Sequence, residues 1–347
     1  MRNLPNSLSI RLLKSITSGV ICLLVIGLPF ITILAYPPAA GASELTDELS
    51  QAVVRLQAHV PEDARTARNL GTLREGNGIL IDKDGLILTI GYLIMESTQI
   101  LVSGPEGHAV PADFVAYDHT SGFGLVRASQ PFSAPPLPLG SSTDIDIGAP
   151  ALVVSSHPYT PVTPARIVSK REFAGYWEYL LPGAIFTMPP HPHFGGAALV
   201  DTQGKLIGVG SLIVPDAFEA GTNDSPGNMF VPIDVLKPIL DSLIKTGKSQ
   251  QPAPPWLGLY PVKGSGRVFI TRVADNGPAK TAGLKTGDIV IGVNEKRISD
   301  VADLYRKIRT SGAAGTTITL NIIPANASNL DIRKIKIKSI DRHDWLK

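Results

Sequence analysis

Three short segments of this chain bring together side chains that could perform nucleophilic or metal-binding chemistry. They are Asp118–Ser121, which contains a carboxylate, an imidazole and a hydroxyl, then Ser155–His157, and finally the histidine-rich segment His191–His193. A serine hydroxyl attacks an acyl group efficiently only when a neighbouring imidazole can take its proton. Neighbours in sequence do not by themselves form such a triad, and none of these serines follows an elbow-like turn. The glycine-rich segment Pro192–Leu199 contains no serine.

Metal binding is a second chemistry to consider, at His191 and His193. In an extended segment, alternate side chains share one face, so both imidazoles could point to one metal ion. Zinc or copper would need a third or fourth ligand, for which His157, His119 and Asp118 are candidates. The alternative is that both histidines are exposed in a proline-rich turn. In that arrangement neither histidine would bind a metal. We expect no metal or other cofactor in this protein.

The composition limits the classes of protein and partner. The chain has 347 residues, a formal net charge of +2 and 18% charged residues, so it has no strong field for nucleic acid. Its 33 glycines and 29 prolines indicate many turns and short strands. The single cysteine, Cys22, excludes a disulfide framework and a thiolate nucleophile in the exported part.

The N-terminus, residues 1–42, reads as a targeting segment. Basic residues precede an apolar run over residues 16–36, and Ala40-Gly41-Ala42 forms a small-x-small cleavage site. The apolar run is longer than a typical signal core, so an uncleaved anchor in the inner membrane remains a rival to a cleaved signal peptide. Either predicts a periplasmic or other extracytoplasmic location.

The elements that must position these residues fall into four stretches. Apolar residues at helical spacing predict a helical arm over residues 43–75. Residues 76–247 contain many short apolar runs between turns, typical of a β-barrel or sandwich, and end in a helix over 233–246. A polar, proline-rich linker over 248–255 precedes a compact module over 256–340 that mixes strands with a helix.

Two of these stretches resemble a known family. Gly76–Thr89 is similar to the opening hairpin of the HtrA/Deg family of trypsin-like serine proteases. Val273–Val290 resembles the "P-A…A-G-L-x-x-G-D-x-I" core of a PDZ domain. Met229–Asp234, followed by a helix, lies between them in the order that the family shows. The resemblance implies a mainly β fold, a trypsin-like double β-barrel followed by an α/β PDZ domain.

The resemblance also implies that a His, an Asp and a Ser meet at the cleft between the barrels. Here Tyr92 holds the histidine position and Gly122 the aspartate position. The serine position falls on Gly195 if the distance to Gly204 is kept, or on Phe194 if the glycine pair is aligned. Neither alignment supplies a hydroxyl, and tyrosine, with an ordinary pKa of about 10, is a poor general base. In proteases of this type, loss of the triad costs on the order of 10⁶-fold in turnover.

The PDZ resemblance implies capture of a peptide C-terminus by strand addition and by backbone N–H groups. Leu257, Gly258 and Leu259 hold the position of the family's carboxylate-binding loop, where the glycine allows close approach. Leu304 and Ile308, at helical spacing, are candidate walls of the peptide groove. For the two leucines of the loop, a place in the groove and a place in the core both remain open.

These observations favour an HtrA-like pseudoprotease that binds polypeptides through the PDZ groove and the barrel cleft. It would be a scaffold, an adaptor or a regulator in protein quality control of the cell envelope. Its expected partners are protein C-termini, an active protease or a membrane complex, and copies of itself in a trimer, with no nucleic acid. Two alternatives are a serine endopeptidase with a relocated site and a metal-binding protein using His191 and His193.

Overall fold

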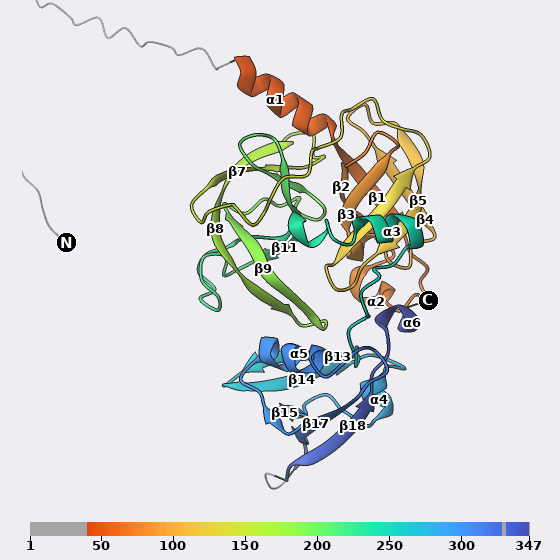
Figure 1. Ribbon diagram of the computed structural model, residues 1–347, viewed down its shortest axis with the longest axis vertical. Helices are drawn as coiled ribbons and strands as arrows, with labels where there is room; N and C mark the ends of the chain where they lie inside the picture. Colours follow the sequence, from red (N-terminus) through yellow and green to blue (C-terminus); the bar gives the residue numbers. More distant parts are fainter. Residues whose placement is uncertain (1–39, 328–330, 347) are drawn as a thin grey trace, which may run out of the picture. The chain divides into compact units, whose positions relative to one another are not determined.

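Two six-stranded β-barrels and a smaller mixed domain make up the part of the chain that the computed structural model describes, residues 40–327 and 331–346 (Figure 1). These residues lie within one compact unit, Ala39–Lys347. The predicted apolar run over residues 16–36 lies outside the described residues. Within the described ranges, none of the helices is both long and apolar enough to cross a membrane.

The first barrel is antiparallel, with neighbouring strands in the order β1, β2, β3, β6, β5, β4. Its strands are β1 (Val53–His59), β2 (Leu73–Leu80), β3 (Leu86–Ile90), β4 (Gln99–Ser103), β5 (Ala109–Tyr117) and β6 (Phe123–Ala128). The predicted turn between β2 and β3 is confirmed: Asp82 Oδ1 accepts from the N–H groups of Asp84 and Leu86, and Gly85 has a φ of 78°. A short α2 (Ala67–Leu70) and a 3₁₀ helix η1 (Gly91–Leu93) lie in its connections.

The helical arm predicted over residues 43–75 is wrong beyond Gln51. Helix α1 spans Ala40–Gln51, and Val53 begins β1, whose residues pair with both β2 and β4. Val53 and Leu56 fit a helical spacing, but adjacent β-branched residues favour a strand, and pairing on both edges decides the outcome. The first barrel therefore begins at β1, before Gly76.

The second barrel has the order β10, β11, β12, β9, β8, β7. Its strands are β7 (Pro150–Val154), β8 (Val162–Gly175), β9 (Tyr179–Met188), β10 (Ala198–Val200), β11 (Leu206–Val214) and β12 (Gly227–Pro232). Strands β8 and β9 form a long hairpin whose turn lies at Tyr176–Glu178. Buried apolar side chains of both barrels, including Leu88 and Phe186, join in one cluster, so the two barrels share a core.

The helix predicted over residues 233–246 is interrupted. The structure has a 3₁₀ helix η2 (Ile233–Val235) and a helix α3 (Leu240–Thr246), with Pro238 between them. Proline lacks the N–H that a continuous helix needs. Gly247 ends α3 as predicted, with a φ of 72° and its N–H donating to Leu243 O.

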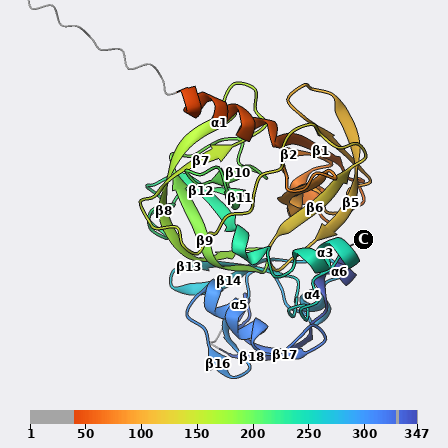
Figure 2. The same cartoon turned by 45° about the horizontal axis from the view of Figure 1, so that its top comes forward.

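The C-terminal domain is a sheet in the order β13, β14, β15, β17, β18, with β16 paired to β15. Its strands are β13 (Leu259–Gly264), β14 (Arg267–Val273), β15 (Ile289–Val293), β16 (Lys296–Arg297), β17 (Thr317–Ile323) and β18 (Arg333–Lys338). Helices α4 (Pro278–Thr281) and α5 (Val301–Arg309) accompany the sheet, and α6 (Arg342–Trp345) follows it. The turn of the β8–β9 hairpin lies against α5 and the start of β13 (Figures 1 and 2). The two closed barrels and the mixed C-terminal sheet agree with the predicted mainly β fold class.

Candidate functional site

Tyr92 and Gly195 face each other across the contact between the barrels. Tyr92 lies in η1, directly after β3, and its hydroxyl donates to Ser211 O at 3.0 Å. Gly195 lies in the loop before β10, and a Cβ added to it would stand 2.9 Å from the Tyr92 hydroxyl oxygen. Burial raises the pKa of Tyr92, so the phenol stays protonated at neutral pH. The side chain that meets residue 195 is therefore a hydrogen-bond donor already engaged elsewhere.

Gly122 lies beside this pair, in the turn between β5 and β6. Its carbonyl accepts from Gly91 N at 2.7 Å, which ties the turn to the residue before Tyr92. Its φ is 82°, and a Cβ at this position would stand 3.1 Å from the hydroxyl of Tyr179. The three residues assigned to the triad positions are thus brought to one region, but they supply no imidazole, carboxylate or aliphatic hydroxyl.

Asn77 organises the loop around Gly195, and no sequence motif points to this residue. This β2 residue is 3% exposed, and its Nδ2 donates to the carbonyl oxygens of His193 and Gly195, each at 2.9 Å. Its Oδ1 accepts from the N–H and hydroxyl of Ser156 at 2.8 and 2.9 Å. Gly196 packs so closely that an added Cβ would lie 2.0 Å from Asn77 O. The loop is therefore fixed by a buried amide whose partners lie far away in sequence.

His191 and His193 lie close together, and His157 lies beside them. The rings of His191 and His193 are inclined at 71° with centroids 5.9 Å apart, and His193 stacks on His157 at 3.8 Å. His191 is 2% exposed, so the expectation of two exposed loop histidines is wrong for this one. Burial, then the neighbouring His193 and His157, lowers the pKa of His191 to about 4, so it is neutral at pH 7. No group of three potential metal ligands occurs among the described residues.

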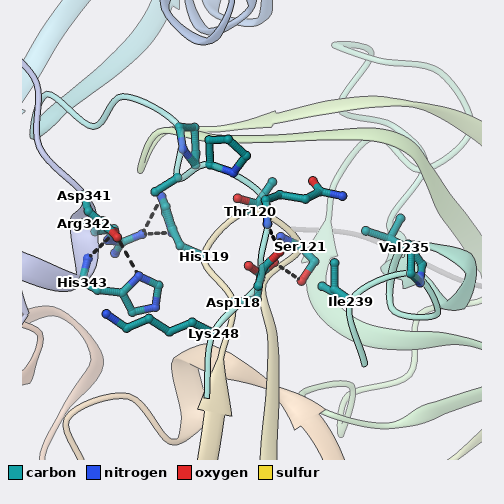
Figure 3. Close-up of a pocket in the computed structure, with 16 residues that line it drawn as sticks. Asp118, His119, Thr120, Ser121, Val235, Ile239, Lys248, Asp341, Arg342 and His343 are labelled. Atoms are coloured by element: carbon teal, nitrogen blue, oxygen red, sulfur yellow. Dashed lines mark hydrogen bonds and ion pairs between the residues drawn. The ribbon is translucent and has the colours of Figure 1, made fainter. Parts of the chain in front are cut away.

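The serines proposed for a relocated site have other partners. Ser121 donates its hydroxyl to Asp118 Oδ2 at 2.6 Å, whereas His119 accepts from Arg342 Nη1 at 2.6 Å (Figure 3). Ser155 donates to Thr160 O at 3.2 Å. In residues 40–327 and 331–346, no serine hydroxyl pairs with an imidazole nitrogen.

Asp118, His119, Ser121 and Arg342 line a cavity of about 360 Å³ between the first barrel, the linker and the start of α6 (Figure 3). Burial, followed by the charges of Arg342, Arg309 and His343, lowers the pKa of His119 well below its usual range. A neutral His119 accepts a hydrogen bond from Arg342, and Figure 3 shows its ring directed toward that side chain and not toward Ser121. The cavity therefore has no imidazole positioned to activate Ser121, whose hydroxyl is bonded to the carboxylate of Asp118.

The loop predicted to bind a carboxylate holds one in this structure. Glu178, in the turn of the β8–β9 hairpin, accepts from the N–H of Leu257 at 3.0 Å through Oε2. Its Oε1 accepts from the N–H groups of Gly258 and Leu259, the latter at 2.7 Å. Gly258 has a φ of 80°, the left-handed conformation that suits glycine. The sequence did not identify Glu178, because its role depends on contact with residues about eighty positions away.

The predicted groove residues are buried together. Leu257, Leu259, Leu304 and Ile308 are each at most 2% exposed and belong to one apolar cluster of the C-terminal domain. Leu180, two residues after Glu178, belongs to the same cluster. Both leucines of the loop are thus part of the core while their backbone N–H groups face the carboxylate.

Comparison with known proteins agrees with this architecture. Residues 76–209 match the model of the trypsin-like peptidase domain, and residues 255–332 match that of the PDZ domain. The structure of the HtrA-type protease AlgW with a decapeptide superimposes with a TM-score of 0.52 at 19% identity, covering 88% of this chain and 98% of that one. A Yersinia pestis serine endoprotease gives a TM-score of 0.51 at 21% identity, covering 88% of this chain and 99% of that chain. At this level of identity the likeness establishes the fold.

Two curated proteins with similar sequences are named as serine proteases. The serine protease PepD of Mycobacterium tuberculosis is 30% identical over 268 residues, which are 71% of this chain and 57% of PepD. The serine endoprotease DegS of Salmonella typhimurium is 26% identical over 252 residues, 67% of this chain and 68% of DegS. The matched region thus spans little more than half of PepD. The chain is a homologue of the HtrA serine proteases, with a trypsin-like peptidase domain followed by one PDZ domain.

Proposed function

We propose that this chain is a pseudoprotease that binds polypeptide C-termini through its PDZ domain. It would serve as a scaffold, adaptor or regulator in the cell envelope. The observation that carries the proposal is the loop Leu257–Leu259, whose three N–H groups converge on a carboxylate. A backbone nest that binds the carboxylate of Glu178 has the donors to bind the terminal carboxylate of a peptide.

The residues where the two barrels meet support the proposed loss of catalysis. Acyl transfer requires a hydroxyl at the nucleophile position and an unprotonated base within hydrogen-bond reach. Gly195 supplies no hydroxyl, and Tyr92 is a protonated phenol that donates to Ser211 O. Gly122 cannot orient an imidazolium. The proposal therefore assigns Tyr92, Gly122 and Gly195 to the degenerate triad.

Proteolysis of unfolded casein tests the absence of catalysis. The purified full-length protein should cleave casein no faster than the background, while trypsin in the same buffer serves as the positive control. The variants Ser121→Ala, Ser155→Ala, Ser156→Ala and Tyr92→Phe should show the same background rate as wild type. Cleavage that disappears in one serine variant would instead establish a relocated endopeptidase site and end the pseudoprotease proposal.

We further propose an extracytoplasmic location and an assembly in trimers. Support for the location comes from similar proteins named as probable periplasmic endoproteases in Pseudomonas species, together with the targeting pattern of residues 1–42. Fusion to alkaline phosphatase, which is active only after export, tests the location.

Light scattering after gel filtration tests the trimer, and a monomeric mass would contradict it. Co-purification from the native membrane fraction would identify the partner.

A further inference from the structure

We propose that Glu178 is an internal ligand of the PDZ domain, which holds the carboxylate-binding loop closed to a peptide C-terminus until the β8–β9 turn withdraws. The inference rests on the proposed peptide-binding function and adds its regulation. The occupant that must compete with Glu178 is a polypeptide with a free terminal carboxylate and an apolar last side chain.

The contact between Glu178 and the loop reproduces the chemistry of a bound C-terminus. Both carboxylate oxygens are used, and all three loop N–H groups from Leu257 to Leu259 donate to them. Each of these three N–H groups therefore already donates its hydrogen bond to Glu178. A backbone N–H has one proton to donate, so a peptide carboxylate cannot be bound in the same way while Glu178 is present.

Leu180 corresponds to the apolar last side chain of a bound peptide. It is 5% exposed and belongs to the buried cluster that contains Leu257, Leu259, Leu304 and Ile308. The main chain at this residue is also held, because Arg309 of α5 donates to Leu180 O at 2.8 Å. The hairpin thus places a carboxylate and, two residues later, an apolar side chain in the region predicted to form the groove.

Tyr305 of α5 holds the β8–β9 turn in place by two hydrogen bonds. The hydroxyl of Tyr305 donates to Gly175 O at 2.9 Å and accepts from Glu178 N at 3.1 Å. Glu178 has a φ of 60°, a left-handed conformation that costs energy for a residue with a side chain. The docked turn compensates for this strain with its contacts to the PDZ domain, and the strain is relieved when the turn is free to relax.

Burial adds a second cost to the docked state. Glu178 is 7% exposed, and burial raises its pKa to about 7, against the opposing effect of the loop N–H groups and of Arg342. Ionisation of Glu178 therefore costs more in the docked state than in water, because the loop N–H groups replace only part of the lost solvation. Strain and desolvation together leave the closure poised for a competing carboxylate to displace it.

Strand β13 lies at an edge of the described sheet. In the described sheet, β13 pairs with β14 on one edge and with no strand on the other. A peptide could therefore add as a strand along β13 once its terminal carboxylate has replaced Glu178. The closure blocks the Leu257–Leu259 loop. This loop is the part of the site that distinguishes a chain terminus from an internal segment, because only a terminus has a free carboxylate.

Peptide binding to the full-length protein tests the closure. The probe is a fluorescein-labelled mixture of decapeptides of random sequence that end in leucine with a free carboxylate, and the same mixture amidated at the C-terminus is the negative control. Glu178→Ala should bind the free-acid mixture about tenfold or more tightly than wild type, because removal of a closed state raises the fraction of competent protein. Glu178→Gln, which keeps the size of the side chain, should lie between the two.

Glu172→Ala is the matched control. Glu172 lies on the same hairpin and pairs with Arg306 of α5 at 3.3 Å, with both side chains exposed, but it does not reach the loop. This variant should bind as wild type does. A second measurement is hydrogen exchange of the Leu257–Leu259 amides, which should speed up in Glu178→Ala and stay unchanged in Glu172→Ala.

The outcomes separate this inference from the proposed function. Equal binding by wild type and Glu178→Ala, with unchanged exchange of the loop amides, would overturn the closure and leave the peptide-binding function intact. Equal affinity for free-acid and amidated mixtures, or no binding by any variant, would overturn both proposals. Faster exchange in Glu178→Ala together with tighter, carboxylate-dependent binding is the result that supports the closure.

Discussion

Asn77 shows how one buried amide can hold a loop that carries no chemistry of its own. Its side chain joins β2 to the carbonyl oxygens of His193 and Gly195 and to Ser156. We expect Asn77→Ala to lower the free energy of unfolding by about 2–4 kcal/mol, because several buried polar groups lose their partner together. Urea unfolding followed by circular dichroism measures this change.

The control for Asn77 is Ser156→Ala. That variant removes one hydroxyl and leaves the backbone N–H of residue 156 bonded to Asn77, so about 1 kcal/mol or less should be lost. If Asn77→Ala were no more destabilising than Ser156→Ala, the loop would not depend on the amide, and its shape would have to be attributed to Gly196 alone.

Gly122 is fixed as glycine by its surroundings as well as by its backbone. Its φ is 82° and Tyr179 Oη would stand 3.1 Å from an added Cβ, whereas Gly107 has a φ of 80° with nothing within 4 Å. Gly122→Ala should therefore cost more than Gly107→Ala, by about 1 kcal/mol or more, because only the former adds crowding to the strain. Thermal unfolding of the two variants gives the comparison, and equal losses would show that crowding by Tyr179 is unimportant.

At the scale of elements, the β8–β9 hairpin links the second barrel to the PDZ domain, and this link should depend on pH. In the docked state the pKa of Glu178 is about 7, against 4.5 as its ordinary value. Between these values the docked state keeps a proton that the released state has lost, so release becomes easier as pH rises. Peptide affinity of wild type should therefore increase from pH 5 to pH 7, by up to about tenfold per pH unit, and then level off.

Other charges face Glu178, so a variant must isolate its contribution. Arg309 and Tyr305 of α5, Tyr260 of β13 and Arg342 of α6 interact with it electrostatically. Burial raises the pKa of both tyrosines, and arginine remains charged, so none of the four titrates between pH 5 and 7. Glu178→Gln should show a flat profile across this range. A profile that keeps the wild-type slope in this variant would assign the pH dependence to another group.

The elements that the sequence predicted well are those fixed by local chemistry. The β2–β3 turn follows from Asp82 and Gly85, which satisfy the turn within five residues. The PDZ domain was recognisable because its glycine and proline signals lie within Val273–Val290. The helical arm was wrong after Gln51 because the spacing of Val53 and Leu56 also suits a strand, and only pairing with β2 and β4 distinguishes the two.

The candidate sites were less predictable because their decisive partners are remote. Tyr92 and Gly195 could be named from motifs, and their approach in the structure agrees with that assignment, which stays a prediction. Asn77 and Glu178 could not be named, since their partners lie far along the chain. A carboxylate in a turn reads as a solvated side chain until a second domain covers it.

For the whole molecule, two groups of contacts join the PDZ domain and its C-terminal extension to the barrels. One is the β8–β9 hairpin, where Glu178 accepts from the loop N–H groups, Tyr305 donates to Gly175 O and Arg309 donates to Leu180 O. The other is formed after the last strand, where Arg342 donates to His119 at 2.6 Å and His343 Nε2 lies 2.8 Å from Tyr117 O. The linker between the domains is polar and proline-rich, so the docked arrangement depends on these contacts.

Weakening both groups of contacts should therefore loosen the PDZ domain, whereas weakening either one should not. Glu178→Ala leaves the α6 contact, and Arg342→Ala leaves the loop contact, so each single variant should keep the radius of gyration of wild type in small-angle X-ray scattering. The double variant should show a larger radius, because a tethered domain then samples many positions. The coupling is non-additive, as expected for two contacts that restrain the same motion. Full expansion in the Arg342→Ala variant alone would mean that Glu178 contributes no docking energy, and the closure of the peptide site would then need another cause.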